Sequence, residues 1–257
     1  ERKHAEEVLR ESESSLQGIL QSTADGILAV NRDNQVLFAN DRFVEMWLIP
    51  QEVMASRDDS VLLQCVLDQL IDPPSFLQKV QELYMSNQES FDTLYFKDGR
   101  VFDRLSRPLM QGTELRGRVW SFRDITARKQ AEALQNAVYR IAQTSELAES
   151  LSDLFPHIHR IISEVMPAEN FYIALYDQAR NRMSFPYSID QVDKTYEGEE
   201  IEPGKGLTAY VLRTGKSLLC TESIKEDLVL QGEVERIGVP SSSWLGVPLI
   251  VRSKVIG

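Results

Sequence analysis

The sequence predicts an α+β protein of two domains, each built on a central antiparallel sheet with flanking helices, and joined by a long helix. The length of 257 residues suits about two domains. Short β-forming runs separated by turn residues occur in two clusters, before and after a charged stretch with helical periodicity at residues 127–148. The apolar fraction of 42% and the charged fraction of 26% are those of an ordinary globular chain.

Residues 1–22 are predicted to form an N-terminal coiled-coil helix. Apolar and small residues alternate at spacings of four and three, at Ala5, Leu9, Ser12, Leu16 and Ile19. This spacing makes one narrow stripe on a helix, which is the pattern of a coiled coil. The alternative is a surface helix that packs on its own domain.

Residues 23–126 are predicted to form the first domain, which opens on a hairpin. The run from Gly26 to Val30 is short, apolar and rich in β-formers. It is followed by the turn residues Asn31-Arg-Asp-Asn34 and by a second β-forming run over 35–38. Two strands joined by a tight turn are therefore expected here.

The rest of this domain is predicted from its turn and capping residues. Asp72-Pro73-Pro74 combines a helix N-cap with proline in the first turn, and Asp98-Gly99 between two strand-like runs predicts a second hairpin. The expected elements are, in order, short helices across 40–70, a longer helix over 75–87, and strands over 91–96, 101–105 and 117–125.

This order of elements, with its closing residues, resembles a PAS domain over about residues 15–130. The segment Gly117-Arg-Val-Trp-Ser-Phe-Arg-Asp-Ile-Thr126 is similar to the Asp-Ile-Thr ending at which many bacterial PAS domains pass into a signalling helix. Asp25-Gly26 and Phe38-Ala39-Asn40 also match the first hairpin of the family. The resemblance implies a sensor domain in which Asp124 and Thr126 transmit a signal from the sheet to the following helix.

Residues 127–148 are predicted to form that signalling helix. The positions that alternate by four and three are Ala127, Ala131, Leu134, Val138, Ile141, Ser145 and Ala148. A parallel two-helix coil buries such a stripe, so a homodimer through residues 1–22 and 127–148 is expected. The alternative is an amphipathic first helix of the next domain, and one helix can serve both purposes.

Residues 149–257 are predicted to form the second domain. We expect a helix over 151–166 that breaks or kinks at Pro156 and an acidic loop over 189–203. The other expected elements are strands over 170–176, 182–188, 217–220 and 244–251, and a short helix over 206–215.

Three segments of this domain resemble a GAF domain: Phe171-Tyr-Ile-Ala-Leu-Tyr-Asp177, Gly204-Lys-Gly-Leu-Thr-Ala-Tyr-Val-Leu-Arg-Thr-Gly-Lys216 and Ser243-Trp-Leu-Gly-Val-Pro-Leu-Ile250. The family continues with a further strand and a helix after the point that corresponds to Gly257. The resemblance therefore implies a GAF domain that is incomplete at its C-terminus.

No catalytic unit and no metal site are predicted. The pair Gly204-Lys205 lacks both the upstream glycine and the following Ser or Thr of a phosphate-binding loop, because Glu199 and Gly206 stand at those positions. His157 and His159 are two residues apart, so on a helix they point to different faces, and we expect both to be solvated. No kinase nucleotide-binding motif or cyclase signature occurs.

No cofactor is predicted either, although an unknown small ligand is left open. Flavin-photoadduct PAS domains carry a reactive cysteine where this chain has Asp41. Residues 5–156 contain no histidine, which argues against histidine-ligated haem in the first domain. In the second domain, Cys220 is not followed by the histidine common in bilin-binding GAF domains, and we expect it to be a buried, small apolar residue.

What remains are residues that could line a pocket. If the strand over 117–125 alternates, Trp120, Phe122 and Asp124 share one face. Resemblance and parity give the candidate PAS pocket Phe43, Trp47, Leu94, Phe96, Phe102, Arg104, Trp120 and Phe122. A buried Arg104 guanidinium needs an anionic partner, either Asp41 or a bound carboxylate. The alternative is a packed core without a ligand. For the second domain, the resemblance gives the candidate GAF pocket Phe171, Ile173, Phe185, Tyr210, Cys220 and Trp244.

Charge and composition exclude some classes of binding partner and indicate the cellular compartment. The net charge is −11, with 28 basic against 39 acidic residues, which disfavours nucleic acid and anionic membranes. The two distant cysteines suit a reducing, cytoplasmic compartment, and no apolar run reaches the length of a spanning helix.

The resemblances imply a sensory region that detects a small-molecule or redox/energy signal. It would pass this signal through a dimeric helical linker to an output domain, a histidine kinase or a diguanylate cyclase. The alternatives are a ligand-free dimerisation scaffold and, more remotely, a methionine sulfoxide reductase of the GAF type.

Overall fold

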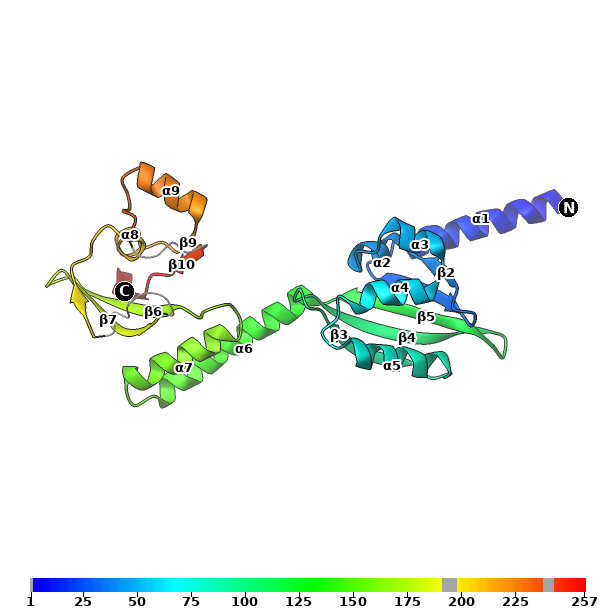
Figure 1. The fold of residues 1–257 in the computed structure, drawn as a ribbon, viewed down its shortest axis with the longest axis horizontal. Helices are drawn as coiled ribbons and strands as arrows, with labels where there is room; N and C mark the ends of the chain where they lie inside the picture. Colours follow the sequence, from blue (N-terminus) through cyan, green and yellow to red (C-terminus); the bar gives the residue numbers. More distant parts are fainter. Residues whose placement is uncertain (1, 191–197, 238–242) are drawn as a thin grey trace. The chain divides into compact units, whose positions relative to one another are not determined.

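The computed structural model describes residues 2–190, 198–237 and 243–257. The chain divides into two compact units, Glu1–Glu132 and Ala133–Gly257. Helix α6 (Thr126–Leu147) begins in the first unit and continues into the second (Figure 1). None of the described helices is long and apolar enough to cross a bilayer.

The first unit is a five-stranded antiparallel sheet with helices packed on one of its faces (Figure 1). The strand order is β2-β1-β5-β4-β3, so the last strand, β5, pairs between the first strand and β4. The strands are β1 (Gly26–Asn31), β2 (Val36–Ala39), β3 (Ser90–Tyr95), β4 (Val101–Gln111) and β5 (Glu114–Asp124). The helices are α1 (Arg2–Gln21), α2 (Asp41–Met46), α3 (Gln51–Ser56), α4 (Asp59–Leu67) and α5 (Pro73–Tyr84).

Two local features account for this sheet. Gly99 has φ +88° in the β3–β4 turn, a conformation that glycine adopts without strain. A Cβ atom at Gly117 would lie 2.1 Å from the carbonyl oxygen of Val30, so only glycine allows β5 to approach β1 this closely. Along β4 and β5, alternate side chains such as Phe102 and Phe122 point into the core.

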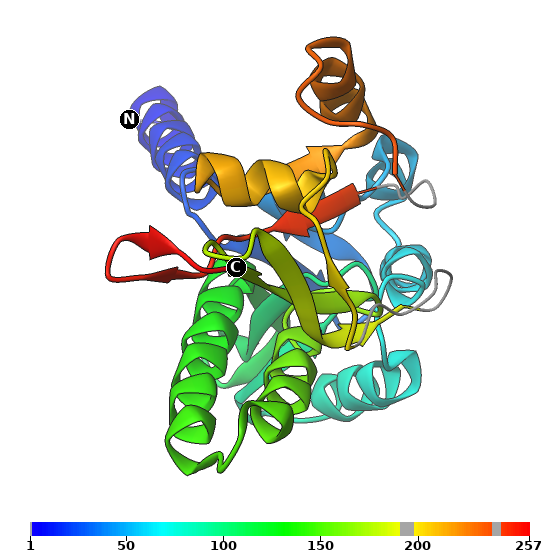
Figure 2. The ribbon, with the colours of Figure 1, turned by 90° about the vertical axis from the view of Figure 1, so that its left-hand side faces the viewer.

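The second unit contains the remainder of α6, helix α7 (Leu151–Ser163) and a three-stranded sheet of order β6-β7-β8. Figure 2 shows α6 and α7 side by side, and an ion pair joins Arg140 of α6 to Glu164 just after α7. Ala174 of β6 and Met183 and Phe185 of β7 form a small apolar core, against which Leu212 packs. The other elements are β6 (Phe171–Asp177), β7 (Arg182–Ile189), β8 (Glu200–Ile201), α8 (Leu207–Thr214), β9 (Leu218–Thr221), α9 (Glu222–Leu230), β10 (Ser243–Gly246), β11 (Ile250–Val251) and β12 (Lys254–Val255).

The predicted α+β architecture is confirmed, and several local predictions in the second unit are wrong. Helix α7 continues through Pro156, so of the predicted break or kink the break is wrong. Pro156 is exposed, and water can hydrogen-bond to the carbonyl that the missing N–H leaves free. The expected strand over 244–251 is interrupted between β10 and β11, at Pro248. Helix α9, capped by Thr221, was not expected. Of the predicted loop over 189–203, residues 191–197 lie outside the described residues, and β8 occupies part of the rest.

Helix α6 presents two different faces. Ala137 is 6% exposed, and Ile141, Thr144 and Ala148 are half-buried. Leu134 and Val138 are 58% and 60% exposed. The predicted stripe therefore divides: its later members Ile141 and Ala148 belong partly to the second unit, while its central members face solvent in the single chain. The exposed apolar residues of α1 are Val8, Leu16 and Ile19, and the side chains of Ala5 and Leu9 lie outside the described part of the chain.

Candidate functional site

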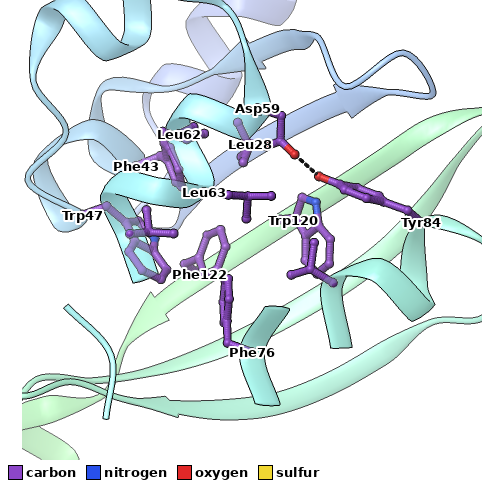
Figure 3. A pocket seen from close by; sticks show the side chains of 12 residues that line it. Leu28, Phe43, Trp47, Asp59, Leu62, Leu63, Phe76, Tyr84, Trp120 and Phe122 are labelled. Carbon is purple, nitrogen blue, oxygen red and sulfur yellow. Dashed lines mark hydrogen bonds between the residues drawn. The ribbon is translucent and has the colours of Figure 1, made fainter. Parts of the chain in front are cut away.

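The core of the first unit contains a small, mostly apolar cavity between the sheet and the helices (Figure 3). Its volume is about 30 Å³, which is room for a water molecule and well below the roughly 150 Å³ that holds a benzene ring. The lining residues are Leu28, Phe43, Trp47, Asp59, Leu62, Leu63, Val66, Phe76, Val80, Tyr84, Trp120 and Phe122.

Aromatic rings fill most of the surrounding space. The Trp47 ring lies 5.0 Å from that of Phe96 and 5.1 Å from that of Phe122, between ring centroids, and the side chain is 1% exposed. The Phe43 ring lies 5.6 Å from Phe122. Phe43 and Trp47 are four residues apart, so they lie on one face of α2 and its last turn. The Trp47 Nε1–H is buried without a hydrogen-bond partner, which costs stability unless a bound group accepts it.

One corner of the cavity is polar. Tyr84, at the end of α5, donates a hydrogen bond of 2.5 Å to Asp59 Oδ2, at the start of α4 (Figure 3). Asp59 is 2% exposed. Burial raises the pKa of the Asp59 carboxyl, partly offset by this hydrogen bond, and the nearby Asp58 raises it further. Burial, and then the charge of Asp59, raise the pKa of the Tyr84 phenol, so Tyr84 stays protonated as a donor.

We expect Asp59→Asn to remove a pH dependence of stability. A carboxyl whose pKa is raised on folding binds more protons in the folded state, so its contribution to stability is greatest at acidic pH. That contribution is lost as the pH rises from the ordinary value of about 4 through the raised pKa of Asp59. Asparagine keeps an acceptor for Tyr84 without a charge. Urea unfolding between pH 4 and 8 measures the difference: the wild-type midpoint should fall relative to that of Asp59→Asn, and parallel midpoints would contradict the role of Asp59.

Two buried arginines lie next to this core. Arg104 is paired with Asp92, through Nε to Oδ1 at 2.8 Å and Nη2 to Oδ2 at 2.5 Å, and its guanidinium lies over the rings of Phe76 and Trp120. The expected partner Asp41 is wrong, because Asp41 is exposed on α2 whereas Asp92 is directly opposite Arg104 in the β3–β4 ladder. Arg104 Nη1 has no hydrogen-bond partner.

Arg118 on β5 is also buried, and it organises the loop that follows α5. Its guanidinium donates to Ser106 Oγ at 2.7 Å and to the carbonyl oxygens of Ser86 and Gln88, both at 2.8 Å. Burial lowers the pKa of Arg118. Its role is thus to hold the loop between α5 and β3 against the sheet.

The structure places the predicted PAS pocket residues in two groups. Phe43, Trp47, Trp120 and Phe122 line the cavity. Leu94, Phe96, Phe102 and Arg104 are buried around it, without lining it. The lining residues that the sequence did not predict come mostly from helices, namely Leu28, Asp59, Leu62, Leu63, Val66, Phe76, Val80 and Tyr84.

The junction between β5 and α6 is held by Asp124 and Thr126. Asp124 Oδ1 accepts a hydrogen bond of 2.8 Å from the backbone N–H of Thr126, in the manner of a helix cap. Thr126 Oγ1 accepts one of 3.0 Å from the backbone N–H of Val101 on β4. The side chains thus tie the first turn of α6 to two strands of the sheet.

The predicted GAF pocket residues come from five strands and helices, and two of them, Cys220 and Trp244, are directly opposite each other in the β9–β10 ladder. The Phe171 ring stacks on His159 of α7 at 4.8 Å between centroids, while Trp244 Nε1 donates to Tyr172 Oη at 3.1 Å. Phe185 and Cys220 are buried in β7 and β9. Ile173 and Tyr210 are half-buried in β6 and α8.

The expectation that His159 is solvated is wrong. The His159 side chain is half-buried, its Nε2 lies 2.6 Å from the carbonyl oxygen of Ala168, and its Nδ1 lies 2.9 Å from Tyr187 Oη. Because a carbonyl only accepts, the Nε2–H of His159 donates to Ala168, and this bond holds the ring against the rest of the second unit. His157, two residues earlier on α7, is exposed as predicted.

Comparisons with known proteins agree with this division of the chain. The family model of the PAS fold matches residues 20–133, and that of the GAF domain matches residues 148–257. No curated protein sequence matches the chain.

Three structures illustrate the likeness to known folds. The sensor region of a sensor histidine kinase is 16% identical, with a TM-score of 0.33, and the match covers 40% of this chain and 40% of that one. The PAS domain of an HTR-like protein from Haloarcula marismortui is 16% identical, covering 48% of this chain and 99% of that one, with a TM-score of 0.37. The PAS domain of Bordetella pertussis BvgS is 16% identical, covering 51% and 96%, with a TM-score of 0.34.

The fold of the first unit, the order of the two units and the two family matches lead to one assignment. The chain carries a PAS domain followed by a GAF domain, two sensory domain types of signalling proteins.

Proposed function

We propose that this chain is a sensory region that detects a small-molecule or redox/energy signal. It transmits this signal through a dimeric helical linker to an output domain, a histidine kinase or a diguanylate cyclase. The observation that carries the proposal is the β5–α6 junction, where Asp124 and Thr126 bond the sheet to the first turn of the linker helix. A change of packing beneath β5 would move the start of α6, and the resulting shift of populations is the signal.

The size and lining of the cavity limit which small molecule the PAS domain could bind. The lining of the space of about 30 Å³ is almost entirely apolar, and the Asp59 carboxyl at its edge already accepts a hydrogen bond from Tyr84. A signal molecule larger than a few atoms would have to displace aromatic side chains, and this displacement would change the packing of Phe122 on β5. This supports a compact, largely apolar ligand rather than a large planar cofactor.

The second candidate is a ligand-free dimerisation scaffold, and the small size of the same cavity favours it. In that case the PAS core is a packed hydrophobic core with no room for a ligand. Ligand-dependent thermal shifts of the purified chain separate the two functions, because a scaffold has no site through which a small molecule stabilises it.

We expect Asp124→Ala to loosen the start of α6 without unfolding the PAS core. The substitution removes the acceptor of the Thr126 N–H, a hydrogen bond worth about 1 kcal/mol. Amide hydrogen exchange over residues 126–133 should therefore become faster, while exchange in β4 and β5 stays unchanged. Asp33→Ala, at an exposed aspartate in the β1–β2 turn, is the control. Unaltered exchange over residues 126–133 in the Asp124 variant would remove the junction from the proposal.

A further inference from the structure

A row of charged side chains crosses the outer face of the PAS sheet, the face opposite the core. Asp25, just before β1, pairs through both carboxylate oxygens with Arg123 of β5, at 2.8 and 2.9 Å. Arg123 is directly opposite Asp103 of β4, whose charge also acts on it. Asp103 Oδ2 in turn accepts from Arg128 of α6 at 3.2 Å. The charges therefore alternate in sign from β1 to the first turn of α6.

At the Asp25 end of the row, the side chain of Asn40 connects Asp25 to the last turn of α1. Asn40 is fully buried, and its Nδ2 donates to the carbonyl oxygens of Leu20 and Asp25 at 3.1 and 2.9 Å and to Thr23 Oγ1 at 3.2 Å. Its Oδ1 accepts from the N–H groups of Ile27 and Phe43. The side chain of Asn40 thus links the end of α1 to β1 and to α2 through hydrogen bonds.

A second contact at the same place involves the side chain of Gln21. Gln21 Oε1 accepts from the backbone N–H of Asp41 at 2.8 Å, at the first residue of α2. Two side chains near the end of α1, Gln21 and Thr23, therefore hold it against the start of α2.

Asp25 belongs to both sets of contacts, because its carbonyl oxygen is bound by Asn40 and its carboxylate by Arg123. We infer that Asn40, Asp25, Arg123 and Asp103 couple the position of α1 to that of α6, so that the PAS domain relays a movement of the helix before it to the helix after it. The inference rests on the proposed signalling role of α6, but the coupling itself can be measured without a ligand or an output domain.

The physical reason is that the first link in the row is directional, because the bidentate pair of Asp25 with Arg123 fixes orientation as well as distance. Arg123 then acts on Asp103 through charge across the β4–β5 ladder, and Asp103 accepts one hydrogen bond from Arg128. A movement of α1 that shifts Asp25 changes its pairing with Arg123, and Asp124 is the next residue along β5. Arg123 and Arg128 are largely exposed, so each pair is weak by itself and is screened by salt. The coupling should accordingly diminish in 1 M NaCl.

The test perturbs one helix and measures amide exchange at the other, in the full chain. Gln21→Ala combined with Thr23→Val weakens the docking of α1. Exchange over residues 126–133, where the Lys129 N–H donates to the Ile125 carbonyl, should become about three- to tenfold faster. When Arg123→Gln or Asp25→Asn is already present, adding Gln21→Ala and Thr23→Val (the docking variant) should not speed exchange over residues 126–133 any further. Arg107→Gln breaks an exposed ion pair with Glu89 on the same sheet and should leave the coupling intact.

Coupling is reciprocal, so Asp124→Ala should also speed exchange over residues 17–23 by a similar factor. If Asp124→Ala speeds exchange in α6 but not over residues 17–23, the role of the β5–α6 junction is retained and the relay is wrong. The relay is equally wrong if the docking variant leaves residues 126–133 unchanged, or if its effect persists in Arg123→Gln. If the double variant loosens the whole sheet, Gln21→Ala alone, at an exposed residue, repeats the comparison.

Discussion

Replacing Trp47 by alanine is expected to destabilise the PAS domain by about 3–5 kcal/mol. The Trp47 ring contacts those of Phe43, Phe76, Phe96, Phe102 and Phe122. Its removal leaves a cavity that rigid aromatic neighbours cannot fill. A loss of this size is a large fraction of the stability of a small domain, so the PAS domain should unfold at much lower urea concentrations.

The matched variant is Trp47→Phe. It retains a ring, and it removes an indole N–H that has no hydrogen-bond partner, so it should cost less than about 1.5 kcal/mol. Amide exchange of separate peptides across a urea series distinguishes the two domains, because peptides of the GAF domain should keep their wild-type midpoint. Equal losses for the alanine and phenylalanine variants would mean that a phenyl ring at this position does not stabilise the core, and would contradict the prediction.

The strands of the PAS domain can be predicted further than its helices. Two-residue alternation along β4 and β5 is enough to assign Phe102, Trp120 and Phe122 to the core side, where all three are buried. The partner of Arg104 is one residue away from what the Asp98-Gly99 signal predicts. A two-residue turn at Asp98-Gly99 would bring Asp92 opposite Leu105, whereas the observed register places Asp92 opposite Arg104 because the loop contains one more residue.

The helices that line the cavity give no such signal. The segment Val61-Leu-Leu-Gln-Cys-Val-Leu67 is apolar on nearly every side, so its periodicity does not reveal which residues face inward. Asp59 escapes prediction for a different reason. Aspartate is rarely buried, and only the tertiary contact with Tyr84, twenty-five residues away, makes its burial intelligible.

In the linker helix α6, hydrophobic periodicity predicts the helix but not the surface that covers its apolar stripe. The four-three stripe identifies α6, but a stripe does not state which partner covers it. Ile141 is half-buried within the second unit, whereas Leu134 and Val138 are exposed apolar residues on the face that is left open. Leu134 and Val138 are four residues apart and lie one above the other along the helix. A second copy of the same helix is the partner that a parallel coil requires.

Val138→Glu is therefore expected to convert a dimer into a monomer, raising the dissociation constant about a hundredfold or more, which is roughly 2.7 kcal/mol. A glutamate in each helix would place two like charges in the seam, away from water. Asn136→Glu adds the same charge on the opposite side of α6, at an exposed residue, and should leave the dimer intact. Ile141→Glu is a poorer probe, because it would also disturb the second unit. Sedimentation equilibrium at tens of micromolar decides the question: a wild-type monomer, or a dimer that survives Val138→Glu, would mean that residues 134 and 138 are not the seam.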